Sequence, residues 1–204
     1  MTDSPPAPRT VARRDTLVVT AIGLLPIVGI TVGALLGKLS PNPIEDVTHV
    51  TGEWALRFLV ATIAITPLRR FTGWARLAPQ RRTFGLLAFA YAVLHMLTWA
   101  VLDQGLHWPS IREDLTERPF VWAGATALLA MTPLAFTSTR ASMRRLGRRW
   151  VALHRLVWVA MAAAIVHFWW LVKADELQPA FWAVVAAVLL GLRFRPSRLQ
   201  AGAP

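Results

Sequence analysis

Long apolar stretches separated by short charged segments dominate this sequence and restrict the folds open to it. The first stretch, residues 17–36, contains no charged side chain. A helix needs about 20 apolar residues to cross the hydrocarbon core of a membrane. Over the 204 residues, 55% are hydrophobic and only 16% are charged, whereas a soluble domain has about 25% charged residues. The pattern predicts a polytopic membrane protein.

We expect an all-α fold in which about six transmembrane helices form a bundle. After the first helix, the expected helices cover residues 52–68, 83–102, 119–136, 150–172 and 179–192. The Pro-rich and polar residues 1–15 are expected to be disordered. The expected organisation is a cytoplasmic tail (1–16), one transmembrane domain (17–194) and a second cytoplasmic tail (195–204).

The positive charges indicate which side of the membrane each loop faces. The net charge is +11, but the Lys and Arg residues do not form the single stripe expected of a nucleic-acid-binding face. Most lie in four clusters, at residues 9–14, 69–82, 140–149 and 193–198, which share one side if the chain crosses six times. All 11 acids except Asp3 and Asp15 fall on the other side. Because Lys and Arg collect in cytoplasmic loops, we expect a bacterial inner-membrane protein with both termini in the cytoplasm.

Several kinds of chemistry are excluded by what the sequence lacks. The chain has no Cys, which rules out disulfides, thiolate metal sites and covalent c-type haem attachment. No internal repeat and no Gly-rich nucleotide loop are visible. The basic loops are too short to hold a flavin or nicotinamide domain. We therefore expect the function to reside within the membrane or at its surfaces.

Three of the five His residues lie inside expected helices, where an ionisable side chain is costly and calls for an explanation. His95 lies about 18 Å and His167 about 25 Å from the cytoplasmic start of its helix, at 1.5 Å per residue. Imidazoles between helices suit haem iron, so we expect His95 and His167 to share one haem in the outer half. His154 lies a turn inside the cytoplasmic edge and cannot reach that iron. A second haem at His154, with its other ligand unidentified, remains an alternative.

Arg57 is the other charged residue considered for the cofactor site. It lies one to two turns inside the outer end of its helix, where it could pair with a haem propionate. The alternative is a pair with Glu53, four residues earlier, or an outward-pointing side chain. His49 and His107 are interpreted as solvent-side residues.

Motifs along most of the chain after Leu17 resemble those of the MsrQ (YedZ) family, in order and at compatible spacing. As a set they are specific, although each alone is weak. They are the stretches 49–56 (HVTGEWAL), 66–68 (TPL), 81–86 (RRTFGL), 91–95 (YAVLH), 118–119 (RP), 136–139 (FTST), 146–150 (LGRRW) and 153–154 (LH), ending at His167.

The resemblance implies the haem-binding membrane subunit of a periplasmic methionine sulfoxide reductase system, with a ferric-reductase-like transmembrane domain. Electrons would pass from the quinone pool or a flavin reductase, through b-type haem, to a periplasmic molybdopterin subunit (MsrP-like) that repairs oxidised proteins. The chain would carry electrons without holding the catalytic site for methionine sulfoxide. His95, His154 and His167 occupy the family's histidine positions. FMN is a second cofactor that the resemblance implies, although no sequence feature places it.

Two other functions remain open from the residues alone. One is a stand-alone ferric or oxygen reductase, against which the absence of a nucleotide domain argues. The other is a haem-free transporter or assembly factor in which His95 and His167 relay protons. Transporters usually show paired repeats and broken helices, and neither is visible in the sequence.

Overall fold

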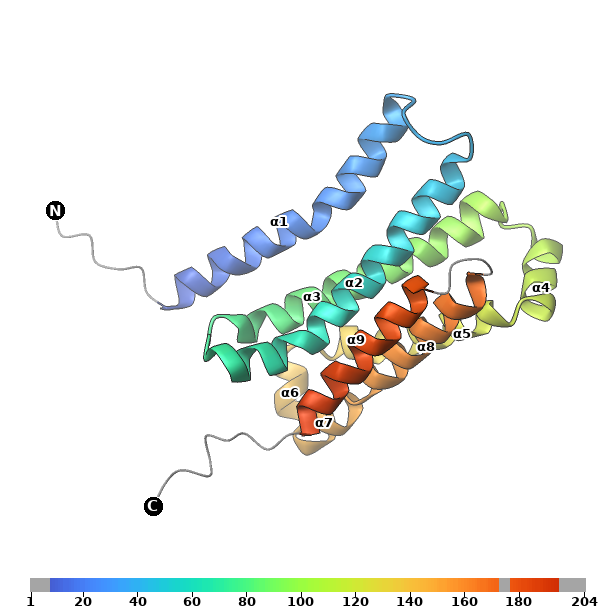
Figure 1. Cartoon of the computed structure of the whole chain (residues 1–204). Coiled ribbons are helices and arrows are strands. Elements are labelled where there is room, and N and C mark those ends of the chain that lie inside the picture. Colours follow the sequence, from blue (N-terminus) through green and yellow to red (C-terminus); the bar gives the residue numbers. More distant parts are fainter. Residues whose placement is uncertain (1–7, 173–176, 195–204) are drawn as a thin grey trace, which may run out of the picture.

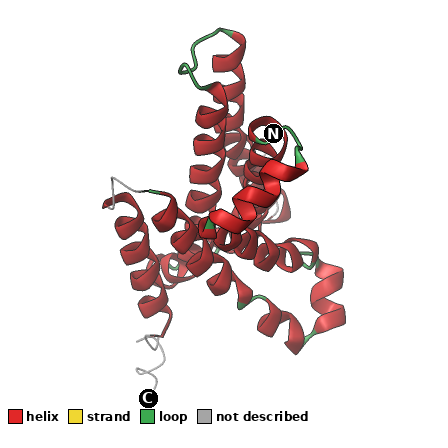
Figure 2. Ribbon diagram, turned by 90° about the vertical axis from the view of Figure 1, so that its right-hand side faces the viewer, coloured by secondary structure: helices red, strands yellow, loops and turns green. Residues whose placement is uncertain are grey.

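The computed structural model describes residues 8–172 and 177–194, and every regular element in these ranges is a helix (Figures 1 and 2). The elements are α1 (Pro8–Leu35), α2 (Pro43–Thr72), α3 (Leu77–Leu97), the π-helix η1 (Thr98–Asp103), α4 (Trp108–Glu117), α5 (Pro119–Phe136), α6 (Arg140–Leu146), α7 (Arg148–Leu153), α8 (Leu156–Leu171) and α9 (Leu177–Phe194).

Two antiparallel hairpins form the centre of the molecule. Helix α2 packs mainly on α3, and α5 packs mainly on α8. Helix α9 lies beside α2 and α8, while α1 lies along the outside of α2 and α3 (Figure 1). The short helix α4 is at one end of the bundle, and α6 and α7 are at the other. The two ends therefore differ in charge. The acidic residues of the segment 103–117 lie at the α4 end, and the basic loops 69–82 and 140–149 lie at the opposite end, called the basic end below.

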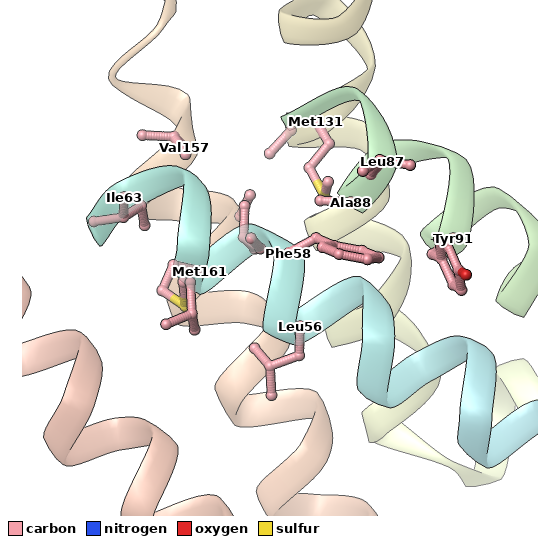
Figure 3. Packing of buried hydrophobic residues seen from close by; sticks show 13 residues of the cluster. Leu56, Phe58, Ile63, Leu87, Ala88, Tyr91, Met131, Val157 and Met161 are labelled. Carbon is pink, nitrogen blue, oxygen red and sulfur yellow. The ribbon is translucent and has the colours of Figure 1, made fainter. Parts of the chain in front are cut away.

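The core lies where the two hairpins meet. Phe58 from α2 is buried between α3 and α5 (Figure 3). Met161 of α8 packs against α2. Ala88 of α3 and Ala160 of α8 are fully buried. Small side chains at helix contacts let the backbones approach closely, which is a common way for helices to associate in membranes.

Helix α1 is attached to this core by few contacts. The Tyr91 hydroxyl donates a hydrogen bond of 2.7 Å to the backbone carbonyl of Gly23, and Tyr91 is only 1% exposed. Much of the α1 surface is apolar and uncovered, with residues such as Val28 (52% exposed) and Leu35 (82% exposed). In water this surface would be unfavourable, but it is what a membrane helix presents to lipid.

The expected number of membrane crossings is supported in part by length and composition. Four stretches qualify: Arg13–Leu35, Leu77–Asp103, Pro119–Phe136 and Arg148–Leu171. Helix α9 is apolar but shorter, and α2 is long enough at 30 residues but carries Glu53 and Arg57. The all-α membrane bundle is thus confirmed, and the crossings by α2 and α9 stay predictions.

Several boundaries differ from those expected from hydropathy. The fourth expected helix matches α5 exactly, because Pro119 begins it. Helix α1 begins at Pro8, so residues 8–15 are helical and not disordered; residues 1–7 and the tail 195–204 lie outside the described residues. Helix α2 extends well beyond residues 52–68 because Asn42 caps its start and Gly73, at φ 69°, its end.

Two helices that were expected to be regular α-helices change their hydrogen-bonding pattern or break along their length. The third continues from α3 into the π-helix η1, and the fifth breaks into α7 and α8 at His154 and Arg155. The loops before and after α5 also contain short helices, α4 and α6 respectively. In α4 the Asp114 carboxylate is buried and accepts hydrogen bonds from Trp99 Nε1 (3.0 Å) and Gln104 Nε2 (3.1 Å), which fixes α4 against η1. Hydropathy cannot reveal the position of α4 because it depends on hydrogen bonds between particular side chains.

Candidate functional site

The structure brings together the two His residues that the depth argument paired. His95 lies three residues before the start of η1, and His167 lies near the end of α8. Their ring centres are 6.0 Å apart, and the ring planes are inclined at 83°. Both rings are partly buried between the hairpins. They lie toward the end of the bundle that carries α4, away from the basic loops.

Each ring is held by a hydrogen bond to the backbone of the neighbouring helix in its own hairpin. His95 Nδ1 lies 3.0 Å from the carbonyl oxygen of Thr48 in α2, and His167 Nδ1 lies 2.7 Å from that of Phe120 in α5. A carbonyl can only accept, so Nδ1 carries the proton in both rings. Each Nε2 is then left with a lone pair, and none of the described residues donates to it.

Two neutral imidazoles at this separation are close enough to be ligands of one metal ion. Imidazole nitrogens bind metals at about 2 Å, which places the centres of two opposed rings about 6 Å apart. Metal-binding His residues usually donate their other ring nitrogen to a carbonyl or carboxylate, as both do here. No cluster of three or more His, Cys, Asp or Glu residues suited to a metal occurs in the described ranges.

The two hairpins repeat one arrangement. In each, the His comes 47 residues after the residue whose carbonyl accepts its hydrogen bond. In each, a glycine follows that acceptor by four residues: Gly52 after Thr48, and Gly124 after Phe120. No internal repeat is visible in the sequence itself. Equal spacing of glycine and His in the two halves was the signal that could have revealed it.

His154 lies apart from this pair, near the basic end of the bundle. It occupies the turn between α7 and α8, where its Nδ1 is 3.1 Å from the carbonyl oxygen of Trp150. The ring also stacks on the Trp150 indole, with centres 3.7 Å apart and an angle of 25°. Its Nε2 is buried, and no described residue bonds to it. Gln80, at the start of α3, is the other described residue with buried polar side-chain atoms that lack a partner.

Arg57 pairs with Glu53, one of the two arrangements that the sequence left open. Arg57 Nη2 is 2.6 Å from Glu53 Oε2, and the guanidinium lies over the Trp54 ring at 4.9 Å. The Arg57 side chain is 40% exposed, so it still has surface available to another anionic group. His49 is exposed beside Glu45, while the His107 ring lies 2.9 Å from Ser110 Oγ at the start of α4. Neither of the two takes part in the site.

Comparison with a family model identifies the type of bundle. Residues 51–165 match the model described as "Ferric reductase like transmembrane component". The match covers most of both hairpins, with His95 and His154, and ends two residues before His167.

Curated relatives match between 76% and 89% of this chain. A protein of Xanthomonas oryzae pv. oryzae (strain MAFF 311018) is 42% identical over 194 residues, 89% of each chain. One of Xanthomonas campestris pv. campestris (strain 8004) is 47% identical over 155 residues, 76% of this chain and 71% of the relative. One of Brucella anthropi is 44% identical over 177 residues, 86% and 80% of the two chains. All three are named "Protein-methionine-sulfoxide reductase heme-binding subunit MsrQ". No solved structure matches the chain.

Proposed function

This chain belongs to the MsrQ family of ferric-reductase-like transmembrane proteins, and on that premise we propose that it is a haem-binding electron-transfer subunit of a methionine sulfoxide reductase system. The relatives carry haem binding and the reductase in their names. The chain would accept electrons on one side of the membrane and deliver them on the other. It would not itself hold the catalytic site for methionine sulfoxide.

The observation that carries the proposal is the pair of rings from His95 and His167. Their centres are 6.0 Å apart, and each Nδ1 is bound to a carbonyl, so that both Nε2 lone pairs are free for iron. When bound, a b-type haem supplies a one-electron carrier. The chain's own part would be to hold the haem through the neutral imidazoles of His95 and His167 and to fix the orientation of both rings by packing. The missing cysteines agree with a haem held without covalent attachment.

The basic end of the bundle supports a second, weaker element of the proposal. His154 presents a buried Nε2 to which no residue of the described ranges bonds, so its lone pair is available to a metal. A second haem at this position would place a carrier near the cytoplasmic face. Arg57, at the other end, would share its charge between Glu53 and a haem propionate. We also propose that the chain binds FMN, as a cofactor in addition to haem.

We place the chain in the bacterial inner membrane, with residues 17–194 as the transmembrane domain and the tails 1–16 and 195–204 in the cytoplasm. The donor would be the quinone pool or a cytoplasmic flavin reductase. The acceptor would be a periplasmic molybdopterin-containing reductase (MsrP-like). The short basic loops support an external donor, because neither can hold a nicotinamide domain.

Reporter fusions test the orientation. A reporter active only in the periplasm should work when fused after Gln104 and should be silent after Ser142. The reverse pattern would turn the His95 and His167 end toward the cytoplasm and overturn the proposed direction of electron flow.

The absorption spectrum of the purified protein, reduced minus oxidised, tests the haem. We expect the sharp bands of a low-spin b-type haem, reduced by a quinol or a flavin reductase and not by NADPH alone. A protein without haem would favour a transporter or an assembly factor. Rapid haem reduction by NADPH with nothing else present would favour a stand-alone reductase.

A further inference from the structure

We propose that Gly52 and Gly124 are positioning residues for the rings of His95 and His167. Each glycine leaves open the backbone carbonyl to which its His donates, and each leaves the space that the ring occupies. The inference rests on the proposed function, because it concerns the orientation of the two axial ligands. It adds two residues that do not touch the metal but decide how its ligands are held.

Helical geometry explains why the glycines stand where they do. In an α-helix the carbonyl of residue i bonds to the N–H of residue i+4, so these two residues adjoin on one face. A carbonyl oxygen has a second lone pair, which a donor from outside the helix can use. The side chain at i+4 lies beside that lone pair. Gly52 and Gly124 stand four residues after the acceptors Thr48 and Phe120, so no side chain at the i+4 position covers either oxygen. The Thr51 hydroxyl, at i+3, also donates to the Thr48 carbonyl at 3.0 Å, and it leaves room for the His95 ring over Gly52.

The space above Gly52 is filled by the His95 ring. A Cβ added at Gly52 would lie 3.0 Å from both Cε1 and Nδ1 of His95. Such contacts are closer than ordinary van der Waals separation, so the ring would have to shift. Nδ1 is also the atom that donates to the Thr48 carbonyl. The added methyl would therefore act on the hydrogen bond that fixes the ring.

The space above Gly124 is likewise filled by a His ring, that of His167, which would lie slightly closer to an added Cβ than the His95 ring does at Gly52. A Cβ there would lie 2.9 Å from Nδ1 and 3.0 Å from Cε1 of His167. Nδ1 of this ring donates to the Phe120 carbonyl at 2.7 Å. Because the two glycines meet the same two ring atoms in two separate hairpins, a chance packing gap is a poor explanation. The shared geometry points to a common requirement of both ligands.

Other helical glycines of the chain lack this relation and provide matched controls. A Cβ at Gly85, in α3, would have Thr62 Cγ2 as its nearest neighbour at 3.6 Å, which is an ordinary contact. A Cβ at Gly29, in α1, would meet nothing within 4 Å. Substituting Ala at either position should slightly favour the helix.

The experiment measures haem affinity and the low-spin spectrum of four single variants: G52A, G124A, G85A and G29A. We expect G52A and G124A to bind haem about 10–100-fold more weakly, the range seen when an outer partner of a metal ligand is lost. Any haem they retain should show a high-spin fraction. The two controls should match the unmodified protein.

A second measurement separates the ring contact from a general packing role. Thermal unfolding of the haem-free protein in detergent is compared for G52A, H95A and the double variant G52A/H95A. If Ala at position 52 acts through the His95 ring, it should destabilise the protein or prevent folding only while His95 is present. Recovery of the double variant in folded form supports the proposal even if G52A alone does not fold. Equal damage from G52A with and without His95 would overturn it.

The failures of the two proposals remain distinguishable. If H95A and H167A lose haem while G52A and G124A bind it normally, the haem assignment stands and the role of the glycines is refuted. If H95A and H167A keep a full complement of low-spin haem, the proposed ligands themselves are wrong.

Discussion

The two ends of the bundle hold their His residues in different ways. At the α4 end, His95 and His167 each donate to a carbonyl of a neighbouring helix, and their ring centres are 6.0 Å apart. At the basic end, His154 bonds to a carbonyl four residues back in its own segment and stacks on Trp150. The arrangement of His95 and His167 depends on how different helices pack together. The arrangement of His154 depends only on residues close to it in the sequence.

The difference indicates how firmly each imidazole is defined before any metal binds. A ring fixed by a second helix cannot turn without disturbing the hairpin, so its orientation is set by the fold. A ring fixed within its own segment keeps its position but has no opposing His. We therefore expect the α4 end to provide two axial ligands and the basic end at most one.

Removing either ligand at the α4 end should have the largest effect. In H95A or H167A the iron would retain at most one protein ligand, so we expect the haem-to-protein ratio to fall close to zero or the remaining haem to become high-spin. Haem content and the optical spectrum of each purified variant provide the measurement. A normal low-spin spectrum in either variant would contradict the shared site.

Removing the His at the basic end should have a smaller effect. His154 is 13 residues from His167, or about 20 Å along a helix at 1.5 Å per residue, so H154A should keep the low-spin haem of the α4 end. We expect slower reduction by the donor and, if a second haem binds at this end, a lower haem ratio. Stopped-flow reduction and haem content are the measurements. Complete loss of haem in H154A would reverse the comparison.

The smallest effect should come from the stacking partner of His154. In W150L the ring contact and the hydrogen bond from Trp150 Nε1 to the Thr137 carbonyl are both lost. An aromatic pair contributes about 1 kcal/mol beyond its buried area, so we expect modest thermal destabilisation and an unchanged spectrum for the haem at the α4 end. A large spectral change there would mean that the two ends are coupled. W169L, at an exposed position in α8, is the control.

The sequence predicted the elements with strong local signals and missed those that depend on contacts between helices. Pro119 marked the start of α5 correctly, and the depth of His95 and His167 was sufficient to pair them. The break at His154 lies within an almost uninterrupted apolar stretch, so hydropathy did not reveal it. The roles of Gly52 and Gly124 depend on a ring from another helix, and the burial of Asp114 depends on donors from η1. The hydrophobic periodicity of a single segment predicts neither the roles of these glycines nor the burial of Asp114.

If His95 and His167 hold one haem as proposed, the placement of these two residues on separate hairpins also affects how the protein is made. His95 is synthesised about 70 residues before His167, a delay of roughly 4–14 s at about 5–20 residues per second. During that interval the first hairpin can already be inserted in the membrane, with one ligand and no partner for it. Stable capture of the cofactor therefore requires the second hairpin to arrive and dock. Haem incorporation should serve as a sign that assembly is complete, and chains truncated after α5 should enter the membrane without it.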